Sequence, residues 1–198
     1  MTSELKKLEN FFEVIKKFDK DLKFKIIEIG AHPYGDFKES FHILLDHFHG
    51  SEIYAFEVDK EECKKLNKIC KKGMTFFPTA LGEKKETRKF YETYMPVCSS
   101  LYKPKEEFLK LYNNLNIAYL KKTTEIETIS LDEFLNNHDL ECIDFIKIDI
   151  QGAELDVFKG GKKTLEKTLM IVSEVEFVEQ YIDQPLFGDV SSFLKDKK

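Results

Sequence analysis

Three short runs of β-branched and aromatic residues, separated by amphipathic segments, place the strongest constraint on how this chain can fold. The runs occupy residues 24–29, 53–58 and 74–78, and the segments between them, 37–48 and 60–72, have apolar side chains every three or four positions. The first pattern is typical of buried strands and the second of helices. A β-α-β-α-β order requires parallel strands joined by right-handed crossovers. The sequence therefore predicts an α/β fold.

The same alternation returns in the second half of the chain. Ser130 is followed three residues later by Glu133, a capping box that predicts a short helix at residues 131–137. The remaining patterns predict strands at 143–150 and 169–175, helices at 5–18, 104–111, 154–166 and 190–197, and weaker extended segments at 89–94 and 123–129.

Length and composition indicate one globular domain. The 198 residues are 42% apolar, which is enough for a continuous core. No repeat or low-complexity linker divides the chain. We expect an N-terminal helix within residues 1–20, a core over 24–177 and a short tail over 178–198.

The charge pattern argues against nucleic acid and membrane as partners. The net charge is −5, whereas a nucleic-acid-binding surface needs a basic excess. Five lysines between residues 64 and 72 have helical spacing beside acidic residues, which favours a solvated helix face over a phosphate-binding patch. Residues 1–20 are charged throughout, so neither a signal peptide nor a membrane span is expected. A cytoplasmic protein is the expectation.

The cysteines indicate reduced thiols. Cys63, Cys70, Cys98 and Cys142 form neither a CxxC pair nor the spacing of a zinc site. We therefore expect no disulfide framework and no zinc site. Asp149, Glu154 and Glu174 could hold a cation, but the absence of a metal centre is the favoured interpretation.

A glycine and an acid mark the carboxyl ends of the first two predicted strands. Gly30 ends the first strand, with Gly35 in the same loop, and Glu57 closes the second. Ligands of open α/β sheets bind outside these strand ends, where a carboxylate can accept hydrogen bonds from ribose hydroxyls. The structural alternatives are a turn glycine and a surface glutamate before a helix capped by Asp59. The two motifs together favour ribose binding by Glu57.

The strand at 143–150 carries two charges, Lys147 and Asp149, on one face. Charged side chains inside an apolar central strand destabilise the fold unless they form an ion pair, so an unpaired charge there indicates a functional role. Asp149 lies at the carboxyl end, Gly152 permits a tight turn, and Glu154 begins the next helix, where its charge suits the helix dipole. On chemistry alone, a catalytic role and a structural Lys147–Asp149 pair are equally well supported.

A longer motif in this region points to a family. The segment FIKIDIQGAELDVFKGG at residues 145–161 closely resembles the hallmark motif of FkbM-type methyltransferases. Further family-like pieces follow in the family's order over residues 25–193: EIGA at 28–31, YAFE at 54–57, TALG at 79–82, SSL at 99–101, TISLDEF at 128–134 and SEV at 173–175.

The resemblance implies a Rossmann-like class I methyltransferase sheet with strand order 3-2-1-4-5 and S-adenosylmethionine as the cofactor. It implies transfer of a methyl group to a hydroxyl of a sugar, a glycan or a secondary metabolite. The loop from Gly30 to Gly35 would face the methionine part of the cofactor, Glu57 its ribose, and residues 79–81 its adenine. The implied cofactor-binding residues are Glu28, Gly30, Ala31, His32, Gly35, Glu57, Val58, Thr79, Ala80, Leu81 and Asp149.

Methyl transfer to an alcohol benefits from a general base, because the hydroxyl loses its proton as the new bond forms. Asp149 is the first candidate and Glu154 the second. Lys147 would fix the carboxylate or stabilise developing negative charge on the acceptor oxygen. His32 and His42 lie near the expected mouth of the site, but a polar loop residue is the favoured interpretation of His32.

Two departures from the family pattern bear on function. The first glycine loop is one residue longer than usual, with His32 where asparagine is common and Pro33 removing a donor. No antiparallel strand pair is evident after residue 177, so the fifth strand would be an exposed edge that a second copy could cover. The alternative is therefore a catalytically weak or inactive, cofactor-binding partner subunit. A nicotinamide-dependent oxidoreductase is less well supported, because the GxGxxG pattern is missing.

Overall fold

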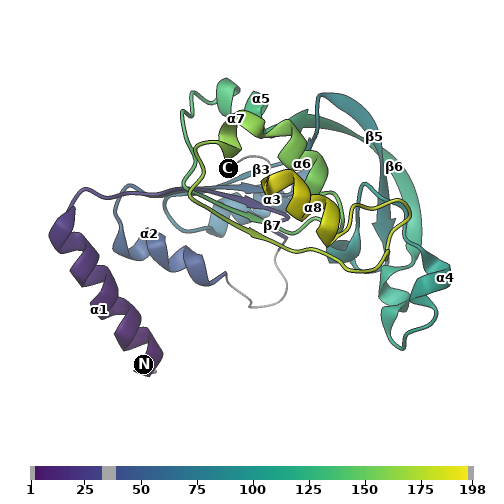
Figure 1. Cartoon of the computed structure of the whole chain (residues 1–198), viewed down its shortest axis with the longest axis horizontal. Coiled ribbons are helices and arrows are strands. Elements are labelled where there is room, and N and C mark those ends of the chain that lie inside the picture. The colour runs from purple at the N-terminus through teal and green to yellow at the C-terminus, as the bar shows by residue number, and fades with distance from the viewer. Residues whose placement is uncertain (1–2, 33–38, 196–198) are drawn as a thin grey trace.

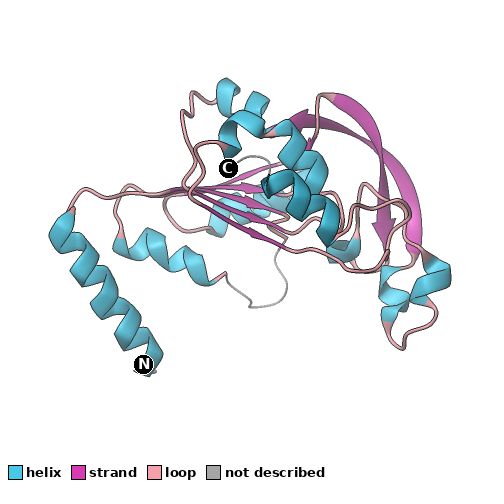
Figure 2. Ribbon diagram, viewed as in Figure 1, coloured by secondary structure: helices cyan, strands magenta, loops and turns pink. Residues whose placement is uncertain are grey.

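The computed structural model describes residues 3–32 and 39–195, and its centre is a five-stranded parallel sheet in the order β3-β2-β1-β7-β8 (Figures 1 and 2). Its strands are β1 (Lys25–Ile29), β2 (Glu52–Phe56), β3 (Met74–Phe77), β7 (Phe145–Ile148) and β8 (Met170–Ser173). The predicted α/β class and its parallel central sheet are confirmed.

Register brings the carboxyl ends of the three central strands to one edge. Ile29, the last residue of β1, lies opposite Phe56 of β2 and Ile148 of β7. The residues that follow these strands therefore meet in one place, which is where open α/β sheets bind their ligands.

Helices cover both faces of this sheet, because the side chains of β1 alternate between two apolar clusters. Ile27 and Ile29 belong to the larger cluster, whereas Ile26 belongs to the smaller one on the opposite face. The larger cluster is covered by α5 (Leu131–Asn137), α6 (Glu154–Gly160), α7 (Lys162–Leu165) and α8 (Phe187–Lys195), and the smaller by α3 (Lys60–Ile69) with η1 (Ser40–Ile43) and α2 (Leu44–His47).

Two helix starts match their sequence signals. The Ser130 hydroxyl accepts a hydrogen bond from the Glu133 N–H at 3.1 Å, so the predicted cap of α5 is confirmed. Asp59 caps α3 in the same way, accepting from Glu61 and Glu62. The four cysteines are free, with Cys63 buried against the sheet.

Three predicted helices differ most from the structure, while the others shift by no more than three residues at their ends. The helix predicted at 37–48 begins in the described residues as η1 and continues as α2. The helix predicted at 154–166 is divided into α6 and α7 by consecutive glycines, Gly160 and Gly161, which are poor helix formers. The helix predicted at 104–111 is reduced to α4 (Glu106–Leu109).

A second, three-stranded sheet lies between the third and fourth strands of the main sheet in chain order. It consists of β4 (Ala80–Gly82), β5 (Glu86–Thr93) and β6 (Leu120–Ser130), in the order β4-β6-β5. The long antiparallel pair β5–β6 curves away from the body and carries η2 (Pro96–Cys98), α4 and η3 (Leu115–Ala118) near its far end (Figure 2). The sequence predicted only isolated extended segments here, because it did not show that they pair.

The N-terminal helix α1 (Ser3–Phe18) stands apart from the sheet (Figure 1). Phe12 anchors it, with 5% of its surface exposed and its ring 5.4 Å from that of Phe48. None of the described helices, α1 included, combines the length and apolar character that a membrane crossing needs.

The edge of the main sheet beyond β8 is open in the described part of the chain. Strand β8 pairs with β7, and the described residues after it form turns and α8 but no further strand. Met170 and Val172 of β8 expose 57% and 44% of their surface. That a second copy covers this edge stays a prediction.

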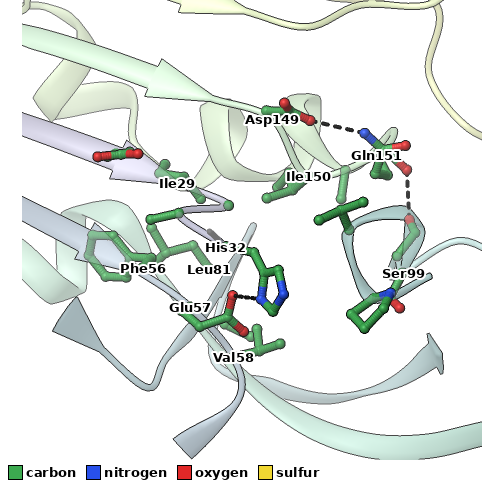
Figure 3. Close-up of a pocket in the computed structure, with 18 of the residues that line it drawn as sticks. Ile29, His32, Phe56, Glu57, Val58, Leu81, Ser99, Asp149, Ile150 and Gln151 are labelled. Atoms are coloured by element: carbon green, nitrogen blue, oxygen red, sulfur yellow. Dashed lines mark hydrogen bonds and ion pairs between the residues drawn. The ribbon is translucent and has the colours of Figure 1, made fainter. Parts of the chain in front are cut away.

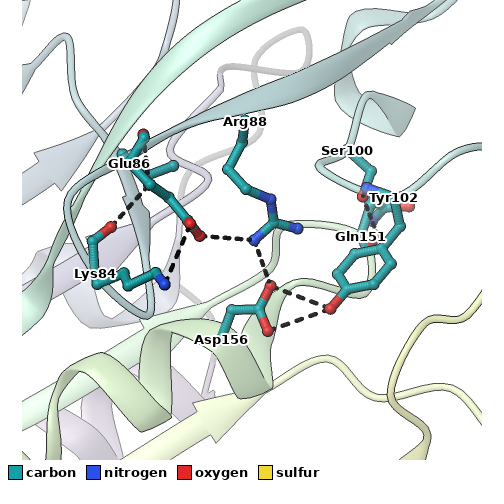
Figure 4. A network of polar contacts seen from close by, with 8 residues as sticks. Lys84, Glu86, Arg88, Ser100, Tyr102, Gln151 and Asp156 are labelled. Carbon is teal, nitrogen blue, oxygen red and sulfur yellow. Dashed lines mark hydrogen bonds and ion pairs between the residues drawn. The ribbon is translucent and has the colours of Figure 1, made fainter.

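A buried ion pair fastens the second sheet to α6 (Figure 4). Arg88 of β5 contacts the Asp156 carboxylate of α6 at 3.1 Å, and the Tyr102 hydroxyl donates to both Asp156 oxygens at 3.2 and 3.1 Å. Asp156 is 6% exposed, so its charge depends on these partners.

We expect Arg88→Ala to lower the free energy of unfolding by about 1–3 kcal/mol, because it leaves the buried Asp156 carboxylate with one partner. Urea denaturation measures the change. Lys84→Ala removes an exposed cation of the same network and should cost less than about 0.5 kcal/mol. Equal losses of stability in the two variants would contradict the role of the Arg88–Asp156 ion pair in holding β5 to α6.

Candidate functional site

A cavity of about 580 Å³ opens at the carboxyl ends of β1, β2 and β7 (Figure 3). Its walls come from the central sheet on one side and from residues 95–101, which follow β5, on the other. Ten of the residues singled out from sequence line it: Glu28, Gly30, Ala31, His32, Glu57, Val58, Ala80, Leu81, Lys147 and Asp149.

Three other candidates lie elsewhere or outside the described residues. Thr79 is not among the lining residues. Glu154 lies beneath the site with 2% of its surface exposed, and its carboxylate accepts a hydrogen bond from the Ile150 N–H at 2.8 Å. Burial raises the pKa of Glu154 to about 7. Gly35 falls outside the described residues.

Gly30 brings the ends of β1 and β7 into contact. Its φ of +79° lies in the left-handed region, and a Cβ added there would sit 1.9 Å from the backbone oxygen of Asp149. A side chain is therefore excluded both by conformation and by space. The N–H groups of Gly30 and Ala31 both point to the Phe56 carbonyl, which ties this turn to β2.

Glu57 is buried at the end of β2, and both its oxygens have partners. Oε2 contacts Nδ1 of His32 at 2.9 Å, and Oε1 accepts from the Asp59 N–H at 2.8 Å (Figure 3). The hydrogen bond to Glu57 raises the pKa of His32, against the opposing effect of burial. Asp59 caps the next helix, as the structural alternative predicted. Glu57 is nevertheless not a surface residue, because it is buried and lines the cavity.

A second histidine–carboxylate pair lies beside Gly30. Nε2 of His42 lies 2.7 Å from Oε2 of Glu28, and both residues line the cavity. The sequence placed His42 near the mouth but gave no sign of its partner, because the contact joins β1 to a helix 14 positions later.

Lys147 of β7, the register partner of Glu28, lies between two carboxylates. Its Nζ is 3.2 Å from Oε1 of Glu39 and 3.5 Å from Oδ2 of Asp149. The structural pair considered from sequence therefore exists, and both of its members also line the cavity.

Asp149 has further polar neighbours: Glu174, which the sequence analysis had grouped with it, and Gln151, which it had not. The side-chain amide of Gln151 donates to Oδ1 of Asp149 at 3.0 Å and to Oε2 of Glu174, which follows β8, at 2.8 Å. Burial alone would raise the pKa of Asp149, but the hydrogen bond from Glu174, the Lys147 charge and Gln151 outweigh it and lower the pKa.

Residues 95–101 form a wall that sequence analysis marked only through the SSL motif. Two hydrogen bonds hold this wall to the rest of the site. The Ser100 hydroxyl donates to the Gln151 carbonyl at 2.7 Å, and the Tyr181 hydroxyl donates to the Cys98 carbonyl at 2.8 Å. The apolar members of the wall are Met95, Pro96, Val97 and Leu101.

The cavity has an acidic lining. Five of the lining residues carry carboxyl groups and one carries an amine: Glu28, Glu39, Glu57, Asp149 and Glu174, against Lys147. Among residues 3–32 and 39–195, no cluster of three His, Cys, Asp or Glu side chains has the arrangement of a metal site.

We expect Gly30→Ala to destabilise the protein by more than about 3 kcal/mol, because the added methyl group would collide with the Asp149 carbonyl. Thermal unfolding followed by circular dichroism measures the effect. Gly188→Ala is the matched control: a Cβ there meets nothing within 4 Å, and its position in α8 should gain up to about 1 kcal/mol. A mild effect at Gly30 would contradict the close approach of β1 and β7.

Comparisons with known proteins agree with the resemblance seen in the sequence. The family model described as the methyltransferase FkbM domain matches residues 28–198. A curated relative, the 2-O-methyltransferase NoeI of Sinorhizobium fredii (strain NBRC 101917 / NGR234), is 47% identical over 62 residues. This match covers 31% of the present chain and 23% of the relative, well under two thirds of its length. No solved structure matches the chain.

Proposed function

Since the chain belongs to the FkbM methyltransferase family, we propose that it transfers a methyl group from S-adenosylmethionine to a hydroxyl of a sugar, a glycan or a secondary metabolite. The observation that carries this proposal is the buried carboxylate of Glu57 at the end of β2, facing the cavity beside the Gly30 turn.

Glu57 suits the ribose of an adenosine, because a carboxylate can accept hydrogen bonds from two neighbouring hydroxyls. Its present partner on the cavity side is His32, 2.9 Å from Oε2. Ribose binding at Glu57 would replace or share this contact. Phe56, Val58 and Leu81 offer apolar surface nearby on which an adenine ring would pack.

The charge of the cavity supports a sulfonium cofactor over a dinucleotide. With Glu174 protonated and the pKa of His32 raised, the four remaining carboxyl groups and the Lys147 amine still leave an acidic lining. Such a lining favours a cation, and S-adenosylmethionine carries a positive sulfur. The same lining would repel the pyrophosphate of a nicotinamide dinucleotide, which usually needs a glycine-rich helix N-terminus. The acidic cavity therefore argues against the oxidoreductase alternative.

In this proposal Asp149 accepts the proton of the acceptor hydroxyl. It lines the cavity, whereas the second candidate, Glu154, is buried beneath it and bonded to the Ile150 N–H. Lys147 contacts Asp149 at 3.5 Å and would keep its carboxylate oriented. Loss of the proton as the oxygen forms its new bond is the step that such a base assists.

The hydroxyl specificity rests on the relative. The matched 62 residues come from a protein named a 2-O-methyltransferase, and they cover 23% of it. The acceptor class is therefore part of the proposal.

A second candidate is a partner subunit that binds the cofactor weakly and has little activity. The observation that favours it is the His32 contact, which occupies Glu57 on the side where a ribose would bind.

Calorimetric titration with S-adenosylmethionine and S-adenosylhomocysteine tests the proposal. We expect saturable binding that Glu57→Gln weakens roughly 10- to 100-fold, the effect of losing a charged hydrogen-bond acceptor. Glu61→Gln, which changes an exposed carboxylate of α3, should stay within about twofold of the original affinity.

Absence of binding by the folded protein would overturn the proposed cofactor. Binding without methyl transfer to any hydroxyl acceptor would favour the second candidate.

A further inference from the structure

Two carboxyl groups meet at the mouth of the cavity, one from each of two neighbouring strands. Asp149 follows β7 and Glu174 follows β8, and the backbone N–H of Glu174 bonds the Ile148 carbonyl at 3.1 Å. A single nitrogen, Nε2 of Gln151, donates to both side chains, at 3.0 and 2.8 Å (Figure 3 shows the Asp149 contact). The two acids are therefore held close together at the cavity wall.

The conformation of Gln151 is fixed by its backbone and by two hydroxyl groups. Its φ of +58° lies in the left-handed region, and its backbone carbonyl accepts from the Ser100 hydroxyl at 2.7 Å. The hydroxyl of Tyr181, a residue 2% exposed, contacts Oε1 of the amide at 3.1 Å. The other end of the amide, Nε2, faces the two acids. Strained backbone of this kind is typical of functional sites.

The pKa values of Glu174 and Asp149 differ because the two side chains have different surroundings. Glu174 is an exposed residue at the cavity wall. A hydrogen bond with Asp149, partial burial of the carboxyl group and nearby negative charge raise the pKa of Glu174 to about 8, whereas the pKa of Asp149 is lowered. At neutral pH the two therefore hold one proton between them. The titratable groups that face them from the surrounding elements are Lys147, Cys98, Glu154, Glu176 and Tyr181.

We propose that Glu174 is a second catalytic carboxyl group, which acts with Asp149 as one proton-accepting pair for the acceptor hydroxyl, with Gln151 as its positioning residue. This inference rests on the proposed function. The hydroxyl oxygen bonds to the methyl carbon, the carbon–sulfur bond breaks, and its electron pair stays on sulfur. The hydroxyl proton passes to the doubly ionised pair and later to water.

A pair is a better base here than a lone aspartate. A salt-bridged carboxylate such as Asp149 is a weak base at neutral pH, because its ionised form is strongly favoured. The doubly ionised pair binds its first proton with a midpoint of about 8, close to the pH at which general bases work well. Glu154 cannot substitute, because it does not line the cavity.

A titration of the cofactor-free protein tests the pair without any turnover. Carboxyl-carbon NMR of glutamate-labelled protein should show a signal with a midpoint of about 8 that disappears in Glu174→Gln. Asp149→Asn should move this midpoint down toward the ordinary range, because it removes the charge that holds the proton. Glu154→Gln and Glu176→Gln assign the other two glutamates whose pKa is raised. A Glu174 signal that titrates in the ordinary range, or ignores Asp149→Asn, would overturn the inference.

Kinetics supply the second readout. The kcat of the original protein should rise with pH up to about 8 and then level off. Glu174→Gln should lower kcat about 100-fold and lose this rise, with cofactor affinity within about threefold. Glu166→Gln changes an exposed residue just after α7 that does not line the cavity, and it should leave both unchanged.

Gln151→Asn keeps a residue that tolerates the left-handed backbone. Its side chain is one methylene shorter, so its amide no longer reaches both acids. The substitution should lower kcat and shift the midpoint of the pH profile without weakening cofactor binding. An unchanged pH profile of kcat would show that Gln151 does not position the two acids.

The two proposals can fail separately. If cofactor binds but Glu174→Gln keeps the original kcat and pH profile, the pair is wrong and the methyltransferase proposal stands. If no cofactor binds, the proposed function fails, and the NMR titration still decides whether the two acids share a proton.

Discussion

The contact between Gly30 and the backbone carbonyl of Asp149 is the constraint on which the site depends. A Cβ at position 30 would sit 1.9 Å from that oxygen, so the ends of β1 and β7 meet only because the residue is glycine. The cavity opens around this point. Glu28, His32 and Glu57 lie on the side of β1 and β2, and Lys147, Asp149 and Glu174 on the side of β7 and β8.

The acids of the cavity are chemically distinct because their neighbours differ. Glu57 is held between a histidine and a backbone N–H, which suits an acceptor of hydrogen bonds. Asp149 lies between a lysine and a second acid, and the pKa of that acid is raised to about 8. When the carboxyl groups of one site have different surroundings, their pKa values differ. One of them can then bind a ligand while another acts as a base.

Sequence periodicity predicted the parallel sheet, and the strand-end rule placed Gly30, Glu57 and Asp149 at one cavity, because both depend on local pattern and topology. The β5–β6 pair was missed, since its partners are joined across a segment of more than 25 residues with little periodicity of its own. The Gln151–Glu174 contact was missed for a related reason: it exists only because β8 pairs with β7.

The central claim is that this cavity holds the methyl donor with its ribose on Glu57 and its sulfur near Asp149. A crystal structure with S-adenosylhomocysteine tests it most directly. The claim predicts ribose hydroxyls within hydrogen-bond distance of the Glu57 carboxylate, His32 displaced or sharing that carboxylate, and the sulfur on the side of Asp149 and Glu174. A ligand bound elsewhere, or one whose ribose lies away from Glu57, would contradict it.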